Sequence, residues 1–523
     1  MTGELNARVA TGIPGLDTIL EGGFLVGGVY IIEGPPGVGK TTLGSHFCFN
    51  HAAAGGRAVY ITLLAESHTR LLQHLRRMSF FDPHVVPERV SYISAFKVLE
   101  TEGLASLIKL VRQTMAAQKA SVVILDGLVS AEEASPTAKD FKKFIHELQV
   151  VTSMIGCTAL LLNSTERPRG FRPERTMVDG IIELEDTIVG QHAVRHLTIR
   201  KMRGASPVRG KHYMQITDDG VSVLPRIETV GVHAGIDNYL AGGPARAQFG
   251  IEHLDQMLDG GVPEGSVTAM VGPSGSGKTL MGLHFLHAGM QKNEAGAYFG
   301  FFERPEALLQ KARRLGLPLS EAREGGLIEV HWNRPVEGVI DLLADRVIAI
   351  AKKHKIKRLF IDGLQGLQAA AESGTRLREV LSCLVDELEN LGVTSVYSSE
   401  TPDLFGENLE VSMQGMSALT HNIVLLNHRE RSTRTRRTLT VLKVRDSSHD
   451  LSVREFAITN QGIVVAPASQ EDRAPRLATE SAPPRAKVSA PKARATSSKP
   501  AGSPARRAPT KTAKKGKTRK QRA

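Results

Sequence analysis

The sequence predicts two tandem α/β domains with mainly parallel sheets, followed by a disordered basic tail. Three observations predict this fold class: a glycine-rich motif that recurs 238 residues later, short apolar runs that alternate with longer amphipathic stretches, and a change of composition after Pro467. The chain has 523 residues, 41% of them apolar, so it can bury more than one hydrophobic core.

The recurring motif is a phosphate-binding loop (P-loop) of the form G-x-x-x-x-G-K-[ST]. It reads GPPGVGKT over residues 34–41 and GPSGSGKT over residues 272–279. The glycines turn the backbone so that N–H groups converge on phosphate oxygens, the lysine reaches the β- and γ-phosphates, and the threonine hydroxyl ligates Mg²⁺. The residues predicted to bind the nucleotide are Gly34, Gly37, Gly39, Lys40 and Thr41 in the first copy and Gly272, Gly275, Gly277, Lys278 and Thr279 in the second.

The repeat extends well beyond these loops. TGIPGLDTILEGG begins at Thr11 and FGIEHLDQMLDGG begins at Phe249, and Tyr60 and Tyr298 open similar strands at the same offset. A period this long indicates a duplicated domain rather than a solenoid. We predict a first domain over residues 1–228, a linker over 229–246, a second domain over 247–466 and the tail over 467–523.

Each half contains short β-branched runs, such as VYIIE, AVYIT, SVVILD and TALLLN. Strands that are apolar without polar alternation indicate a parallel sheet that is covered on both faces. In the first half, helices are expected from Lys40 onward, around residues 68–78 and over residues 139–154. The later stretches HLTIRKMRG and HYMQITDDGVSVL alternate more, so they predict an antiparallel extension of the sheet.

An aspartate ends an apolar run downstream of each P-loop. Asp126 follows VVIL, and Asp362 follows RLFI. In P-loop proteins such an aspartate holds the Mg²⁺ shell, whereas an isolated strand-end aspartate is often only a turn residue. We therefore predict that Asp126 completes a Mg²⁺ site with Thr41, and Asp362 with Thr279.

The positive charge of the chain is concentrated in its tail. The net charge is +12, and from residue 471 onward sixteen Lys or Arg face only three Asp or Glu, so the rest of the chain is nearly neutral. This segment lacks aromatic residues and cannot bury enough apolar surface to fold. It is expected to bind nucleic acid or another polyanion through counterion release, or, alternatively, only to keep the protein in solution.

Cysteine usage and hydropathy point to the cytoplasm. Cys48, Cys157 and Cys383 lie far apart and without CxxC spacing, so neither a disulfide framework nor a zinc site is indicated. The N-terminus does not have the layout of a signal peptide, and apolar runs of about 18 residues are lacking. We therefore expect a cytoplasmic protein that does not associate with membranes.

The combination of T-G-I-P-G-L-D-x-I-L-x-G-G, a P-loop, an apolar strand ending in D-G, and K-x-R-G resembles the KaiC family over about residues 8–465. This family is the double-domain branch of the RecA/RadA-like ATPases. The resemblance implies tandem RecA-like domains in two stacked rings of six, with ATP and Mg²⁺ bound between subunits. The protein is therefore expected to be a homohexamer with unidentified regulatory protein partners.

The resemblance also implies a role for two pairs of cations. Lys201 and Arg203, and in the second copy Lys443 and Arg445, would reach the γ-phosphate bound by the adjacent subunit. Cations two positions apart on a strand lie on the same face, where they can offset charge on the transferred phosphoryl group. The alternative is that all four are solvated charges on a strand face.

The catalytic carboxylate departs from the family pattern. KaiC-like domains usually have two adjacent glutamates after the strand that follows the P-loop helix. These positions fall on Leu64 and Ala65 in the first copy and on Phe302 and Glu303 in the second, and Glu66 lies one place late. Glu303 and Glu66 are the candidates for orienting the attacking water. Because loss of such a group costs about 10²–10⁴ in rate, we expect slow hydrolysis or binding without turnover in one half.

The family also autophosphorylates an adjacent Ser and Thr in its second domain. In the matching stretch QGMSALTHNIVLL, Ser417 stands at the serine position and Ala418 at the threonine position. Ser417 is thus the candidate phosphoacceptor of a Ser/Thr autokinase activity, with an ordinary loop hydroxyl as the favoured alternative.

The function predicted from these features is a hexameric, Mg²⁺-dependent ATPase that acts as a nucleotide-driven signalling scaffold. Two alternatives stay open. The first is a RecA-like ATPase associated with nucleic acid through the basic tail, and the second is a scaffold that binds ATP without hydrolysing it.

Overall fold

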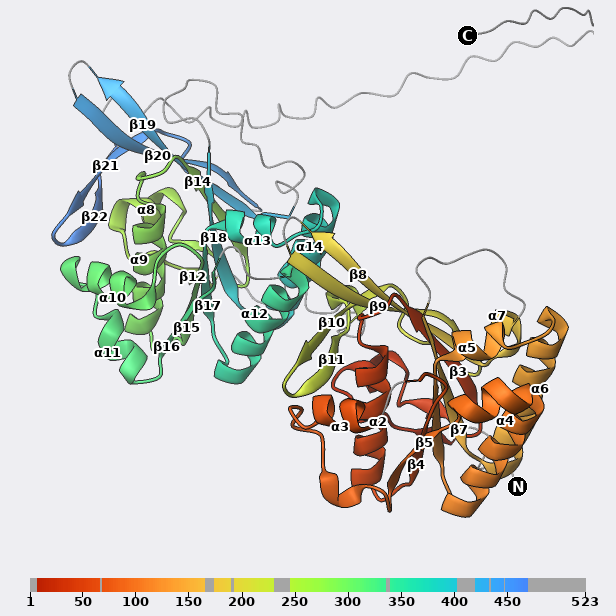
Figure 1. Ribbon diagram of the computed structural model, residues 1–523. Coiled ribbons are helices and arrows are strands. Elements are labelled where there is room, and N and C mark those ends of the chain that lie inside the picture. Colours follow the sequence, from red (N-terminus) through yellow and green to blue (C-terminus); the bar gives the residue numbers. More distant parts are fainter. Residues whose placement is uncertain are drawn as a thin grey trace, which may run out of the picture. The chain divides into compact units, whose positions relative to one another are not determined.

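The computed structural model describes residues 7–65, 68–164, 174–189, 192–229, 245–334, 339–401, 419–431, 434–445 and 447–468 (Figure 1). Within these ranges each half of the chain forms one nine-stranded sheet and one two-stranded ribbon. The ribbons pair β1 (Arg8–Val9) with β2 (Phe24–Leu25), and β12 (Arg246–Ala247) with β13 (Val262–Pro263).

The first sheet has the strand order β11-β10-β9-β8-β3-β7-β6-β4-β5. From β5 to β8 the neighbouring strands are parallel, and from β8 to β11 they are antiparallel. The strands are β3 (Val29–Gly34), β4 (Ala58–Thr62), β5 (Val90–Ser94), β6 (Val122–Asp126), β7 (Thr158–Ser164), β8 (Gly180–Val189), β9 (His192–Met202), β10 (Lys211–Thr217) and β11 (Gly220–Leu224). The predicted parallel sheet with an antiparallel extension is confirmed.

The second sheet repeats this topology strand for strand, with the order β16-β15-β17-β18-β14-β19-β20-β21-β22. The strands are β14 (Val267–Gly272), β15 (Gly296–Gly300), β16 (Ile328–Trp332), β17 (Arg358–Asp362), β18 (Thr394–Glu400), β19 (Asn422–Arg431), β20 (Arg434–Val444), β21 (Arg454–Thr459) and β22 (Gly462–Val465). The arginine-rich residues 429–431 and 434–437 belong to the paired strands β19 and β20. The shared topology confirms two tandem α/β domains.

Helices connect the parallel strands. The first half contains α1 (Leu16–Ile19), α2 (Lys40–Ala53), α3 (His68–Leu75), α4 (Phe96–Gln118), α5 (Leu128–Glu133), α6 (Ala138–Ile155), α7 (Glu174–Met177) and the 3₁₀ turn η1 (Pro83–Val85). The second half contains α8 (Glu252–Met257), α9 (Lys278–Gln291), α10 (Pro305–Arg314), α11 (Leu319–Glu324), α12 (Ile340–His354), α13 (Leu364–Ala369) and α14 (Gly374–Asn390). None of the described helices combines the length and the apolar run needed to cross a bilayer.

The central parallel strands of each sheet are buried on both faces, which explains their lack of polar alternation. In β3, Tyr30 and Ile32 belong to one hydrophobic cluster, and Val29 and Ile31 belong to another. Figure 1 shows α2 and α3 on one side of this sheet and α4 and α6 on the other. Successive side chains of a strand point to opposite faces, so a strand between two helical layers must be apolar throughout.

The repeated T-G-I-P-G-L-D motif has a structural role. The carboxylate of Asp17 accepts hydrogen bonds from the backbone N–H of Thr11 at 2.7 Å and of Gly12 at 2.9 Å. In the second half Asp255 accepts from the N–H of Phe249 at 2.7 Å and of Gly250 at 2.9 Å. Each aspartate therefore closes the loop that leads into the first short helix of its domain.

A buried histidine in each P-loop helix fixes the antiparallel edge of its sheet. His46 on α2 accepts a hydrogen bond from the N–H of Val221 at 3.1 Å, and His284 on α9 accepts one from the N–H of Ile463 at 3.1 Å. Burial lowers the pKa of both histidines to about 4. Both rings are therefore neutral at physiological pH and serve as hydrogen-bond acceptors.

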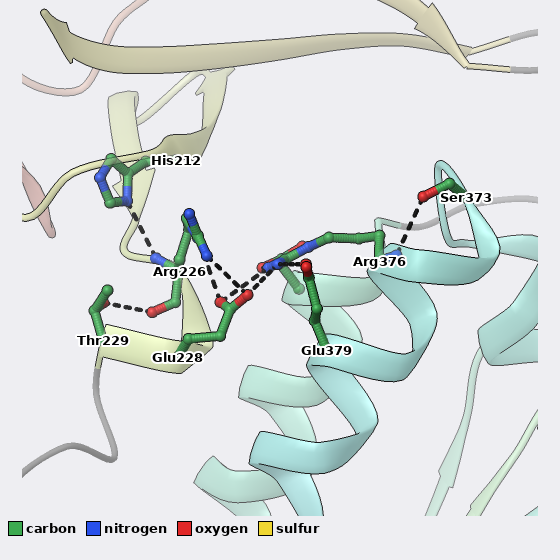
Figure 2. A network of polar contacts seen from close by, with 8 residues as sticks. His212, Arg226, Glu228, Thr229, Ser373, Arg376 and Glu379 are labelled. Atoms are coloured by element: carbon green, nitrogen blue, oxygen red, sulfur yellow. Dashed lines mark hydrogen bonds and ion pairs between the residues drawn. The ribbon is translucent and has the colours of Figure 1, made fainter. Parts of the chain in front are cut away.

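The 3₁₀ turn η2 (Ile227–Thr229) links the first sheet to the second half. Ile227 is buried among side chains of α12 and α14. Glu228 accepts a hydrogen bond from the guanidinium of Arg376 on α14 at 3.2 Å, and Arg376 also donates to Asp341 on α12 at 3.2 Å (Figure 2). Burial alone would raise the pKa of Glu228, but hydrogen bonds from Arg376 and Arg226 lower it to about 2, so the ion pair is fully charged at neutral pH.

Candidate functional site

The first P-loop connects the central strand β3 to helix α2. Gly37 and Gly39 have φ angles of +80° and +111°, which side chains with a Cβ rarely adopt. A Cβ on Gly39 would also lie 2.3 Å from the side chain of Ile216. The loop therefore requires glycine at these positions, and it ends at the N-terminus of α2, where backbone N–H groups attract anions.

The second P-loop repeats this geometry between β14 and α9. Gly275 and Gly277 have φ angles of +74° and +103°. A Cβ on Gly272 would lie 2.4 Å from the carbonyl oxygen of Leu426, and a Cβ on Gly34 would lie equally close to the carbonyl oxygen of Leu184. The predicted glycines thus lie where the backbone needs them in both copies.

The lysine of each P-loop folds over its own loop. The Nζ of Lys40 donates to the carbonyl oxygens of Gly34 at 2.9 Å and Pro35 at 2.8 Å. The Nζ of Lys278 donates to those of Gly272 at 2.8 Å and Pro273 at 2.7 Å. Burial lowers the pKa of both lysines, and nearby carboxylates oppose this shift, Asp126 at Lys40 and Glu400 with Asp362 at Lys278. A phosphate in the loop would offer these buried cations an anionic partner.

The structure brings the predicted magnesium ligands together in both halves. The hydroxyl of Thr41 donates to the Oδ2 of Asp126 at 2.9 Å, and that of Thr279 donates to the Oδ2 of Asp362 at 2.9 Å. Both aspartates are only 9% exposed. A hydroxyl and a carboxylate beside a phosphate-binding loop form the all-oxygen ligand set that Mg²⁺ prefers, so the residues present fit this metal.

A cavity of about 860 Å³ lies over the second P-loop. Its lining includes Lys278, Thr279 and Asp362, together with Phe302 and Glu303 from the segment after β15. The volume falls within the range of about 300–1,000 Å³ that is typical of small-molecule sites. The second half therefore has room for a nucleotide next to the predicted phosphate and metal ligands.

Apolar side chains occupy the position of the first paired glutamate in both halves. Leu64 is 38% exposed and Phe302 is 61% exposed. Each lies against the glycine that follows the metal-site aspartate, because a Cβ on Gly127 would lie 2.9 Å from Leu64 and one on Gly363 would lie 2.4 Å from Phe302. In each half an apolar side chain therefore stands where the family usually has the first glutamate, and it packs against this glycine.

Glu303 is the candidate carboxylate that lies in the lining of the second cavity, which Asp362 and Glu400 also line. It forms an ion pair with Lys311 on α10, and its other oxygen, Oε2, is buried without a hydrogen-bond partner among the described residues. Glu66, the candidate in the first half, lies outside the described residues. The catalytic role of both residues stays a prediction.

The two predicted cations of the first half, Lys201 and Arg203, contact the same backbone segment. Lys201 donates to the carbonyl oxygen of Thr176 at 2.7 Å and to that of Val178 at 2.6 Å, and Arg203 donates to the same oxygen of Thr176 at 2.8 Å. These cations therefore bind backbone carbonyls at the end of α7 within one chain. Their contact with a neighbouring subunit stays a prediction.

The corresponding pair in the second half has similar surroundings. Lys443 donates to the carbonyl oxygen of Thr420 at 2.8 Å, and the backbone N–H of Arg445 donates to that of His421 at 3.1 Å. The candidate phosphoacceptor Ser417 and the tail from residue 469 onward lie outside the described residues. Their roles stay predictions as well.

Several polar contacts at the sites involve residues that were not predicted to be functional. Tyr60 and Tyr298 donate hydrogen bonds to the two metal-site aspartates, and Ser398 donates to Asp362. Arg437 on β20 donates to the carbonyl oxygen of Gly275 in the second P-loop at 3.3 Å. The tyrosines share the 238-residue offset, which is the signal that could have identified them.

Comparisons with known proteins agree with this geometry. The family model described as "ATPase: KaiC" matches residues 9–228 and again residues 247–470. The circadian clock oscillator protein KaiC of Rippkaea orientalis is 24% identical over 468 residues, covering 87% of this chain and 88% of that protein. The circadian clock protein KaiC3 of Synechocystis sp. is 25% identical over 478 residues, covering 87% and 91%. The KaiC of Synechococcus elongatus is 23% identical over 469 residues, covering 87% and 88%.

Replacement of the two P-loop lysines should show that each half binds one nucleotide. We expect Lys40→Ala and Lys278→Ala each to weaken ATP binding at its own site by about 100-fold, because each removes a charge-assisted hydrogen bond to phosphate. Equilibrium binding of a fluorescent ATP analogue should give two sites per chain in the parent, one in either single variant, and none at low micromolar nucleotide in the double variant.

The exposed Lys109 on α4 provides a matched control, and Lys109→Ala should keep both sites. Full occupancy of two sites in the double variant would contradict the assignment of the P-loops.

Proposed function

The chain belongs to the KaiC family of ATPases, and on this premise we propose that it is a Mg²⁺-dependent ATPase that acts as a nucleotide-driven regulatory scaffold. Each half binds one ATP. The copies assemble into a homohexameric double ring, and the nucleotide state of the ring determines which regulatory protein partners it binds.

The observation that carries this proposal is the same arrangement of lysine, threonine and aspartate in both halves. The Thr–Asp hydrogen bond measures 2.9 Å in each copy, and each lysine spans the same two carbonyls of its loop. Mg²⁺ would be held by Thr41 with Asp126 and by Thr279 with Asp362, and when bound it neutralises charge on the β- and γ-phosphates. The lysines bind the same phosphates from the loop side.

We propose that turnover is slow and unequal between the halves. Leu64 and Phe302 cannot polarise water, so neither half has the usual first glutamate. In the second half Glu303 lies in the cavity and is held by Lys311, and Glu400 also lines this cavity, so carboxylates able to orient water are present there. The second half is therefore the site of hydrolysis, and the first half mainly retains ATP.

Assembly would complete both sites. Two cations from each domain, Lys201 with Arg203 and Lys443 with Arg445, would approach the γ-phosphate of the neighbouring subunit. Within one chain Lys201, Arg203 and Lys443 donate to backbone carbonyls, and Arg203 also forms an ion pair with Asp179 at 3.9 Å. Cations supplied in trans make hydrolysis depend on ring formation, which is the property that a regulatory ATPase needs.

Two further activities follow from the sequence and are secondary candidates. Autophosphorylation of Ser417 would use the same bound ATP as phosphoryl donor. Association with nucleic acid is favoured by the tail, which carries sixteen Lys or Arg from residue 471 onward. Polyanion binding by such a segment would be independent of sequence and steeply dependent on salt.

The assignment of turnover to the second half is tested by Glu303→Gln. We expect ATP hydrolysis to fall about 100-fold, because an amide cannot orient or deprotonate water, while ATP binding is retained. Steady-state phosphate release and analogue binding measure the two effects separately.

Glu306→Gln is the matched control, since Glu306 is exposed in the first turn of α10 and should leave turnover unchanged. A comparable loss in Glu66→Gln would assign turnover to the first half and contradict the proposal. Absence of phosphate release in the parent would favour the scaffold that only binds ATP.

Deletion of residues 471–523 tests the role of the tail. The full chain should bind duplex DNA with an affinity that falls steeply as salt rises, and the truncated chain should lose most of this affinity while its ATP turnover is unchanged. Fluorescence anisotropy over a salt series measures the slope. The same salt slope after truncation would show that the tail is not the binding segment, and DNA-stimulated phosphate release would favour a nucleic-acid ATPase.

A further inference from the structure

A tyrosine lies beside each metal-site aspartate, on the neighbouring strand of the sheet. Tyr60 belongs to β4 and Tyr298 to β15, and these strands pair with β6 and β17, which end at Asp126 and Asp362. Both tyrosines are fully buried, at 0% and 1% exposed. The two halves therefore place the same pair of residues at the same point of the sheet.

The hydroxyl of each tyrosine donates a hydrogen bond to the aspartate, since a carboxylate can only accept one. The distance from Tyr60 Oη to Asp126 Oδ2 is 2.6 Å, and that from Tyr298 Oη to Asp362 Oδ2 is 3.1 Å. The threonine of the P-loop donates to the same Oδ2 in both halves. One oxygen of each aspartate is thus held by two hydroxyl groups from different elements.

We propose that Tyr60 and Tyr298 are positioning residues of the two magnesium sites. Rotation about the terminal torsion of an aspartate is broad, so a carboxylate held by threonine alone could turn. A second, rigid donor from the neighbouring strand fixes the plane of the carboxylate and hence its orientation toward the metal and the water bound to it. The inference rests on the proposed function, because only a Mg²⁺–nucleotide site requires this orientation.

In the second half a serine hydroxyl also donates a hydrogen bond to the aspartate. The hydroxyl of Ser398 on β18 donates to the Oδ1 of Asp362 at 2.6 Å and accepts from the N–H of Gly363 at 2.7 Å. In the first half Leu162 occupies the corresponding position of the sheet. Leu162 pairs with Ile32, just as Ser398 pairs with Met270 in the second half. Tyrosine is therefore an orienting donor that the two sheets share, and Ser398 also donates to Asp362 in the second.

Two other buried tyrosines have hydroxyl groups that do not contact Asp126 or Asp362. Tyr397 on β18 is 3% exposed, and its hydroxyl has no hydrogen-bond partner within the described part of the chain. Tyr30 on β3 accepts a hydrogen bond from the N–H of Leu25 at 2.9 Å, away from the metal ligands. These two residues are matched controls, because Tyr→Phe at either removes a buried hydroxyl that does not touch an aspartate of the sites.

The experiment measures the Mg²⁺ dependence of nucleotide binding at one site at a time. In a Lys278→Ala background, which isolates the first site, Tyr60→Phe is titrated with MgCl₂ at a fixed concentration of a fluorescent ATP analogue. In a Lys40→Ala background, Tyr298→Phe is treated in the same way. We expect the half-saturating Mg²⁺ concentration to rise about 10-fold in both, which is the usual effect of losing an outer-shell partner of a metal ligand.

Three readouts separate positioning from packing. Binding of the analogue in EDTA should be unchanged in Tyr60→Phe and Tyr298→Phe, and the controls Tyr30→Phe and Tyr397→Phe should keep the parental Mg²⁺ dependence. An unchanged half-saturating Mg²⁺ concentration would overturn the inference, and so would an equal loss of binding in EDTA. A parent protein whose nucleotide binding does not respond to Mg²⁺ would instead overturn the proposed function itself, and the inference with it.

Discussion

The hydrogen bond between the threonine that follows the P-loop lysine and the aspartate at the end of a neighbouring strand constrains the rest of each domain. Thr41 lies in the first turn of α2, which follows β3 through the P-loop, whereas Asp126 ends β6, with β7 lying between the two strands. The two residues can meet only if these strands are parallel and end at the same edge. The buried carboxylate also needs hydrogen-bond donors, which the threonine and the neighbouring tyrosine supply. The glycines of the loop, the apolar strands and the helices on both faces together hold the threonine and the aspartate at the same edge of the sheet.

The two halves agree in the residues that line the predicted phosphate and metal sites. Lysine, threonine, aspartate and tyrosine recur with the same contacts, and apolar Leu64 and Phe302 stand at corresponding positions, whereas Leu162 of the first half corresponds to Ser398 of the second. Binding needs a complete set of ligands, whereas hydrolysis needs one well-placed carboxylate, so a duplicated chain can lose the second property in one half and keep the first in both. The ion pair of Glu228 with Arg376 then ties the end of the first half to a helix of the second (Figure 2).

Much of the fold and of both sites could be predicted from the sequence, because the signals are local. A P-loop motif fixes its own backbone, and aspartates that end parallel strands meet at one edge. The remaining contacts at the sites depend on tertiary packing that no short sequence pattern encodes. The 238-residue offset identifies Tyr60 and Tyr298 as equivalent residues. It does not show that their hydroxyls contact the aspartates. Likewise, the ion pair between Glu303 and Lys311 depends on how α10 packs. Glu66 and Ser417 lie outside the described residues and remain predictions from sequence.

We propose that both halves hold ATP and that only the second half hydrolyses it. The most direct test is to incubate the protein with ATP and Mg²⁺, remove free nucleotide rapidly, and identify the bound nucleotide by chromatography after acid quench. We expect two nucleotides per chain, with ADP in only one of the two sites, and almost pure ATP in the Lys278→Ala variant. A single nucleotide per chain, or mainly ADP bound to Lys278→Ala, would contradict it.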